Sequence, residues 1–116
     1  MKNSPFFYLE KIEGAYSFVL EPEHPLFAAH FPTYPILPGS CLSDIIVKAV
    51  EDSLEKKVRI SNVSLMKFIS PVFPKINVRY KLILKVKELE GKWLVDVSVV
   101  SEEKAHCKAK LFFVEQ

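Results

Sequence analysis

The residues best suited to chemistry lie in one short proline-rich stretch, HPLFAAHFPTYPILPGS, which spans residues 24–40. Each of its four prolines fixes its own φ angle and keeps the preceding residue out of the helical region, so we expect an ordered loop or extended segment. His30 stands among apolar neighbours there, and an imidazole held in such a setting has the orientation and near-neutral pKa of a general base. A structural role is the alternative for His30 and the favoured interpretation for His24.

The dipeptide of Pro38 and Gly39 stands where a helix is expected to begin. The first turn of a helix has backbone N–H groups without partners and carries about half a positive charge. A glycine lets another molecule approach these groups closely, so they can bind a carbonyl oxygen that becomes negative during a reaction. From this feature alone, an ordinary helix start is the more common explanation.

Asp44 lies in the first turns of the same expected helix, away from its stripe of apolar residues. One interpretation is a solvent-facing acid that pairs with Lys48 four residues later, an interaction worth about 0.2–0.5 kcal/mol. The alternative is a carboxylate that faces a second subunit. The spacing alone leaves both open.

The rest of the pattern predicts the elements that must position these groups. Apolar residues at helical spacing indicate one helix of about 15 residues, which starts near Gly39 and ends before Lys56. Alternating apolar residues indicate strands, with turns at Gly14, residues 90–91 and residues 102–103. The strands are expected within residues 6–20, 63–72, 78–87, 93–99 and 107–113. This order predicts an α+β domain in which an antiparallel sheet curls around one long central helix.

Length and composition are those of an ordinary globular protein. The chain has 116 residues, of which 49% are apolar and 26% charged, so we expect residues 1–116 to form a single domain. The N-terminus lacks the pattern of a signal peptide, and no stretch approaches the roughly 18 apolar residues of a membrane span. Cys41 and Cys107 have no metal-ligand spacing, and we expect reduced thiols in a cytoplasmic protein.

Basic residues are concentrated in one segment, although the formal net charge is only +2. The segment carries Arg79, Lys81, Lys85 and Lys87 at alternating positions. A solvated strand face is the favoured interpretation, and an acidic partner is the alternative. We expect neither a nucleic-acid partner nor a membrane partner.

Two stretches of the chain resemble a known family. The motif HP-L-F-AA-HFP-TY-PILPG, with an acid five residues after its glycine, is similar to the signature of the β-hydroxyacyl-acyl-carrier-protein dehydratases of the FabZ and FabA type. The later stretch NVSLMKFISPVFPK resembles that family's K-F-x-x-P-V-x-P-G strand. The resemblance covers about residues 18–84 and implies the hotdog fold, a curved antiparallel sheet wrapped around one long helix and normally dimeric.

The resemblance implies dehydration of a 3-hydroxyacyl thioester to the trans-2-enoyl form. In this family's arrangement His30 removes the α-proton, the N–H of Gly39 binds the thioester carbonyl, and Asp44 of the other subunit helps to protonate the leaving hydroxyl. No metal or redox cofactor is needed, because the substrate carries its own activated thioester. The residues implied for the substrate-binding loop are Phe31, Pro32 and Pro38.

The resemblance also implies an acidic acyl carrier protein as the partner. Arg79, Lys81 and Lys85 are then candidate contacts with that protein. A homodimer is expected, with a higher oligomer or a heterodimer as alternatives.

Several residues depart from the family pattern. Lys75 stands where the family has glycine, and Lys48 stands where the fatty-acid enzymes usually have glutamine. A lysine one turn after Asp44 favours the ionised carboxylate, which is the poorer proton donor. These departures favour a divergent dehydratase of a particular pathway, such as polyene or polyketide assembly.

Two other functions stay open. A hotdog thioesterase also directs water at an acyl thioester with an acid on the helix, but it does not need the HFP histidine. A non-catalytic acyl-binding subunit would keep the fold without the chemistry. The joint presence of His30, Gly39 and Asp44 favours the dehydratase over both.

Overall fold

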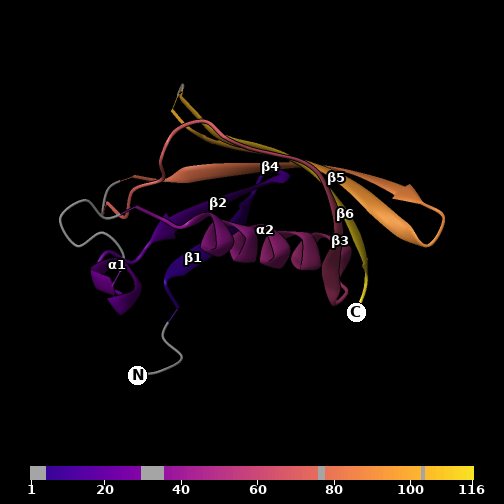
Figure 1. Cartoon of the computed structure of the whole chain (residues 1–116), viewed down its shortest axis with the longest axis horizontal. Coiled ribbons are helices and arrows are strands. Elements are labelled where there is room, and N and C mark those ends of the chain that lie inside the picture. The colour runs from indigo at the N-terminus through magenta and orange to yellow at the C-terminus, as the bar shows by residue number, and fades with distance from the viewer. Residues whose placement is uncertain (1–4, 30–35, 76–77, 103) are drawn as a thin grey trace.

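The computed structural model describes residues 5–29, 36–75, 78–102 and 104–116. None of the helices in these ranges is long and apolar enough to cross a membrane. In chain order, the elements shown in Figure 1 are β1 (Phe7–Ile12), β2 (Ala15–Leu20), α1 (Pro25–Ala29), α2 (Gly39–Leu54), β3 (Val58–Phe68), β4 (Tyr80–Leu89), β5 (Lys92–Ser101) and β6 (Lys104–Glu115).

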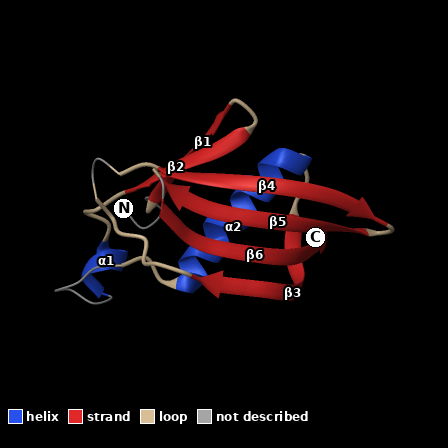
Figure 2. Ribbon diagram, turned by 90° about the horizontal axis from the view of Figure 1, so that it is seen from above, coloured by secondary structure: helices blue, strands red, loops and turns tan. Residues whose placement is uncertain are grey.

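The strands form one antiparallel six-stranded sheet in the order β1-β2-β4-β5-β6-β3. Figures 1 and 2 show that the sheet is curved and that α2 lies against one of its faces. The predicted α+β class, with one long helix on an antiparallel sheet, is therefore confirmed. β1 and β3 are the two edge strands, so each has a neighbouring strand on one side only.

The apolar stripe of α2 forms the centre of the core. Its buried residues recur at helical spacing and are each at most 3% exposed: Leu42, Ile45, Ile46, Ala49 and Val50. The facing side of the sheet contributes alternate residues from four strands, among them Phe18, Leu82, Val97 and Leu111. The predicted helix agrees with α2 at both ends, and Glu55 ends it in the left-handed conformation at φ 55°.

Two of the predicted turns are confirmed by their backbone angles. The β1–β2 turn has positive φ at both central residues, 50° at Glu13 and 82° at Gly14, as a tight two-residue hairpin requires. Gly91, between β4 and β5, has φ 78°. Glu102 follows β5 with φ 46°, while Glu103 lies outside the described residues.

The charged positions of β4 lie on the outer face of the sheet. Lys81, Lys85 and Lys87 are exposed, whereas Tyr80 and Leu82, which alternate with them, are buried against the α2 side. In the single chain these charged positions are therefore exposed to solvent, which is compatible both with a solvated strand face and with an acidic partner.

Two expectations about local structure are wrong in part. The proline-rich stretch is expected to be a loop or extended segment, and Pro38 is extended (φ −63°, ψ 149°). Pro25–Ala29, however, forms the short helix α1, because proline is compatible with the first position of a helix. Residues 30–35 lie outside the described residues. The strand expected within residues 63–72 spans Val58–Phe68 instead and stops before Pro71, which has no N–H for a ladder bond.

A partly buried hydrogen bond ties β2 to α2. The hydroxyl of Tyr16 donates to Oδ2 of Asp52 at 2.7 Å, and the Tyr16 side chain is 4% exposed. Burial, together with the hydrogen bond and the negative charge of Asp52, raises the pKa of Tyr16 to about 12. The bond therefore stabilises the fold only while the phenol is protonated.

We expect this bond to make stability depend on pH in the alkaline range. Because the pKa of Tyr16 is higher in the folded chain than the usual value near 10, its contribution is full below pH 10 and is lost as the pH rises towards 12. Urea unfolding from pH 9.5 to 11.5 is expected to show a decline in unfolding free energy that is smaller in Tyr16→Phe than in the wild type, by at most about 1.5–2 kcal/mol. Tyr8→Phe is the control, since Tyr8 is 53% exposed. Equal declines in all three proteins would contradict the prediction.

Candidate functional site

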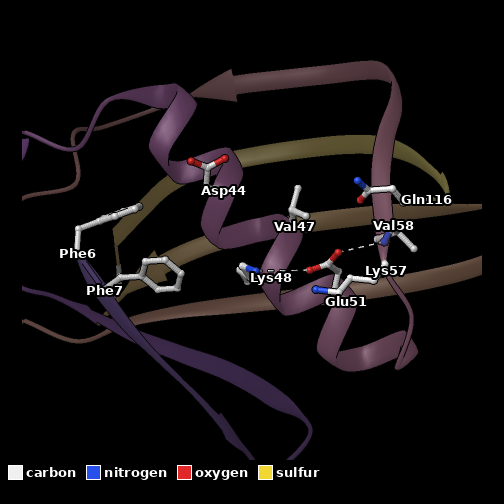
Figure 3. Close-up of a pocket in the computed structure, with 9 residues that line it drawn as sticks. All are labelled: Phe6, Phe7, Asp44, Val47, Lys48, Glu51, Lys57, Val58 and Gln116. Atoms are coloured by element: carbon white, nitrogen blue, oxygen red, sulfur yellow. Dashed lines mark hydrogen bonds and ion pairs between the residues drawn. The ribbon is translucent and has the colours of Figure 1, made fainter. Parts of the chain in front are cut away.

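Gly39 and Asp44 lie on the same helix but line different cavities. Gly39 lines a cavity of about 450 Å³, together with residues 36–38, Leu42, residues 68–72 and His106. Asp44 lines a groove of about 730 Å³ on the outer side of α2, shown in Figure 3. The two cavities share no lining residue among those described. Within one chain, the structure therefore does not bring Gly39 and Asp44 together.

The start of α2 is anchored to the segment that follows β3. The N–H of Leu37 donates to the carbonyl of Val72 at 2.8 Å, and Pro38 caps the helix with its own carbonyl, which accepts from Cys41 and Leu42 at 3.0 and 3.1 Å. Among the described residues, no acceptor pairs with the N–H of Gly39. The helix start therefore offers a backbone donor beside the 450 Å³ cavity, as the sequence predicted.

Gly39 has a second, steric reason to be glycine. A Cβ built on Gly39 would lie 2.8 Å from Cζ of Phe68, and 3.3 and 3.4 Å from its Cε atoms. A side chain at position 39 would therefore require the tip of the exposed Phe68 ring to move. Gly39 does not have a positive φ, so this contact, and not the turn conformation, is the steric argument for glycine at position 39.

The cavity beside Gly39 is mainly apolar, and the two polar side chains that line it are already hydrogen-bonded. Ser70 Oγ donates to the carbonyl of Ala105 at 2.7 Å. His106, 4% exposed, has its Nδ1 2.9 Å from the carbonyl of Pro71 and its Nε2 2.6 Å from Oγ of Ser101. Since a carbonyl only accepts, Nδ1 carries a proton and donates to Pro71. His106 is thus a buried histidine with both ring nitrogens hydrogen-bonded, and it joins β5, β6 and the segment after β3.

Nothing in the sequence pattern indicates that His106 is buried. Strict alternation with Cys107 and Ala109 would have placed it on the outer face. The register of β5 against β6 shifts between Val99 and Val100, and both His106 and Cys107 are buried. A local sequence pattern carries no signal for such an irregularity.

The groove that contains Asp44 is lined by charged residues of α2 and by aromatic residues of the N-terminal segment. Asp44 is exposed, and Phe6, Phe7 and Val58 are among its neighbours along the groove (Figure 3). The position of Asp44 away from the apolar stripe is as expected.

The suggested pair between Asp44 and Lys48 is absent from the described ion pairs. Nζ of Lys48 lies 3.9 Å from Oε1 of Glu51, whose other oxygen accepts from the N–H of Val58 at 3.1 Å. That bond holds the Glu51 carboxylate one turn beyond Lys48, so the lysine turns towards Glu51 and away from Asp44.

The other predicted site residues have different outcomes. His30, Phe31 and Pro32 lie outside the described residues, and the roles predicted for them stay predictions. His24 has a structural role, because its Nδ1 accepts from the N–H of Leu26 at 3.0 Å at the start of α1. Pro38 is the N-cap of α2.

The basic residues predicted to contact a carrier protein lie apart from both cavities. Lys81 and Lys85 are exposed on the outer face of β4, and neither lines the Gly39 cavity or the Asp44 groove. Arg79 shares a hydrogen bond with Oε1 of Glu10 at 3.3 Å and with Oγ of Ser17 at 3.1 Å.

Comparison with known proteins shows the class of this chain. Residues 10–110 match the ApeI-like family, described as ApeI dehydratase. The chain therefore belongs to the ApeI-like dehydratase family, and its resemblance to the hotdog dehydratases is confirmed.

Among curated proteins, the chain is similar to the 3-hydroxyacyl-[acyl-carrier-protein] dehydratase FabZ of Oleidesulfovibrio alaskensis. The two are 28% identical over 67% of this chain and 60% of that protein. The match thus spans less than two thirds of the relative's length.

Solved structures confirm the hotdog fold. The dehydratase heterocomplex ApeI:P from Xenorhabdus doucetiae has a TM-score of 0.76, with 20% identity over 93% of this chain and 95% of the other. The PaaI protein from the phenylacetic acid degradation operon of E. coli has a TM-score of 0.67, with 13% identity over 94% and 82%. A hypothetical thioesterase with coenzyme A from Streptococcus pneumoniae also has a TM-score of 0.67, with 13% identity over 95% and 85%.

The contact between Gly39 and Phe68 gives a prediction whose sign depends on the background. In Phe68→Ala, the change Gly39→Ala is expected to stabilise the chain by less than the roughly 1 kcal/mol that separates the two residues in a helix interior, because Gly39 is the first residue of α2 and no ring opposes its Cβ. With Phe68 present, the same change is expected to be neutral or destabilising, because the ring must move. Urea unfolding of the four proteins measures this coupling. The same change in free energy in both backgrounds would show that the ring does not rest on Gly39.

Proposed function

We propose that this protein is a 3-hydroxyacyl-[acyl-carrier-protein] dehydratase that acts in fatty acid or polyene/polyketide-type biosynthesis. Membership of a dehydratase family supports the class of reaction. The observation that carries the substrate class is the Gly39 cavity, in which a helix-start N–H lies beside an apolar space whose polar side chains are already paired. Such a cavity suits an uncharged acyl chain whose carbonyl oxygen binds at the N–H.

The proposed reaction uses three groups of the protein. His30 takes the α-proton of the 3-hydroxyacyl thioester, and the electron pair left on carbon forms the new double bond as the 3-hydroxyl leaves. The N–H of Gly39 stabilises the negative charge that develops on the thioester oxygen. Asp44 supplies the proton with which the hydroxyl departs as water, directly or through a bound water. These steps need no metal or redox cofactor.

The separation of Gly39 and Asp44 supports an active site shared between two subunits. Five residues along an α-helix correspond to a rotation of about 140° around its axis, so the two residues face different sides of α2. A two-fold dimer brings the Asp44 side of one helix against a second chain and creates two sites at once. The free edge at β3 supports such a contact, because large apolar side chains are exposed along it: Val63, Leu65, Phe68 and Ile69. The partner is a second copy or a related hotdog subunit.

An acyl carrier protein is the proposed donor of the substrate. Lys81 and Lys85, with Arg79 beside them, place positive charge on the outer face of β4 and are the proposed contacts with the acidic carrier.

A hotdog thioesterase is the second candidate, supported by the likeness in fold to the S. pneumoniae protein. A non-catalytic acyl-binding subunit is the third. One assay separates all three: a 3-hydroxyacyl carrier-protein substrate is incubated with the protein, and the products are identified by mass. The dehydratase yields enoyl thioester, the thioesterase yields free hydroxy acid, and the binding subunit yields neither.

Replacement of the proposed base is expected to abolish dehydration. His30→Ala should lower kcat/KM by about 100- to 10,000-fold, the usual contribution of a positioned general base, while the protein stays folded. His24→Ala is the control, since His24 bonds the start of α1, and it should change stability more than rate. Unchanged enoyl formation by His30→Ala would exclude His30 as the base.

Mixing two inactive variants tests the shared site. His30→Ala and Asp44→Ala are each expected to be inactive, and subunit exchange between them creates dimers with one intact site of two. Random exchange should restore about a quarter of wild-type activity. If mass spectrometry confirms exchange and no activity returns, the two residues do not act across a subunit interface.

A further inference from the structure

The contact between Phe68 and Gly39 joins the two walls of the apolar cavity. One wall is the entry to α2, residues 36–39, and the other is the segment from the end of β3, residues 68–72. The ring of Phe68 starts on the second wall, and its tip touches the backbone of the first. The ring therefore lines the cavity beside the residue whose N–H is the proposed binding group for the thioester oxygen.

Phe68 differs from a core residue, because it lies on an edge strand and its side chain is largely exposed. It is the last residue of β3, an edge strand, and its backbone pairs only with Cys107 of β6. Its side chain is 57% exposed, more than any other large apolar side chain among the described residues. An aromatic ring with so much exposed surface contributes less to the stability of the single chain than a buried one. The exposed part of the ring belongs to the edge proposed as the dimer contact, whereas its tip lies beside Gly39 and lines the cavity.

The hydrogen bonds of Ser70 and His106 indicate which features of a ligand the Gly39 cavity can distinguish. Ser70 and His106 are committed to internal hydrogen bonds, so neither has to bind a polar substituent of a ligand. Discrimination within this cavity therefore has to come from shape. The ring occupies the space next to Gly39, where the first carbons of an acyl chain must lie if its carbonyl binds the N–H.

We propose that Phe68 is a specificity-determining residue, whose ring limits the width of the cavity beside Gly39 to straight acyl chains and excludes chains branched near the thioester. This inference rests on the proposed function, because it takes an acyl thioester as the ligand. It adds which acyl shapes the site accepts and which side chain selects them. Gly39 then has two roles, as the backbone donor and as the position that leaves room for the ring.

Equilibrium binding tests this proposal without requiring turnover. The probes are the amide analogues of octanoyl-pantetheine and 4-methyloctanoyl-pantetheine, in which nitrogen replaces the thioester sulfur, so that neither is dehydrated or hydrolysed. Calorimetric titration of the wild type is expected to show tighter binding of the straight chain. Phe68→Ala is expected to reduce that preference at least about 10-fold, since one carbon in a close-fitting apolar pocket is worth about 10- to 200-fold in discrimination.

Val86→Ala is the control. Val86 lies on β4, away from the β3 edge, is 39% exposed and lines neither the Gly39 cavity nor the Asp44 groove, so the variant should keep the wild-type preference. A preference in Phe68→Ala within twofold of the wild type would overturn the proposal, as would failure of the wild type to bind either analogue. A wild type that shows the expected preferences but forms no enoyl product would refute the dehydratase function and leave the role of Phe68 standing.

Discussion

The burial of one stripe of α2 on the curved sheet is the interaction on which the rest of the structure depends. Ile45 and Ile46 are fully buried, and each apolar side chain of this size contributes about 1.5–3 kcal/mol when it leaves water. This burial fixes the rotation of the helix about its axis. Once that rotation is set, Asp44 has to face away from the sheet, and Gly39 has to meet the segment that follows β3.

The helix start is held in place by long-range bonds as well as by packing. The bond from Leu37 to Val72 joins it to the segment after β3, and His106 joins that segment to β5 and β6 through Pro71 and Ser101. A buried network in which every member has a partner is rigid, because each lost bond would leave a buried polar group without a partner. The same hydrogen bonds that hold the fold together therefore also fix the wall of the Gly39 cavity.

The fold and the site contribute differently to the functional conclusion. The hotdog architecture is shared with solved thioesterases as well as with a dehydratase complex, so it does not separate the two reactions. The match to the ApeI-like family favours the dehydratase. Gly39 and Asp44 face different sides of α2, and the proposed reaction needs both. Their separation therefore supports an active site built from two subunits.

The sequence by itself determined the elements whose signals are local. Helical spacing from Leu42 to Val50 predicted α2, alternation predicted the faces of β4 to β6, and Gly14 and Gly91 predicted tight turns, because each pattern reflects which side chains must leave water or which backbone angles are allowed. The HFP and PILPG motif determined the family. Only the tertiary structure decided the contacts between distant segments: the ring of Phe68 on Gly39, the burial of His106 at a register shift, and the pairing of Lys48 with Glu51. These depend on strand register and on the rotation of α2, which arise when residues far apart in the chain pack together, so no short stretch of sequence contains them.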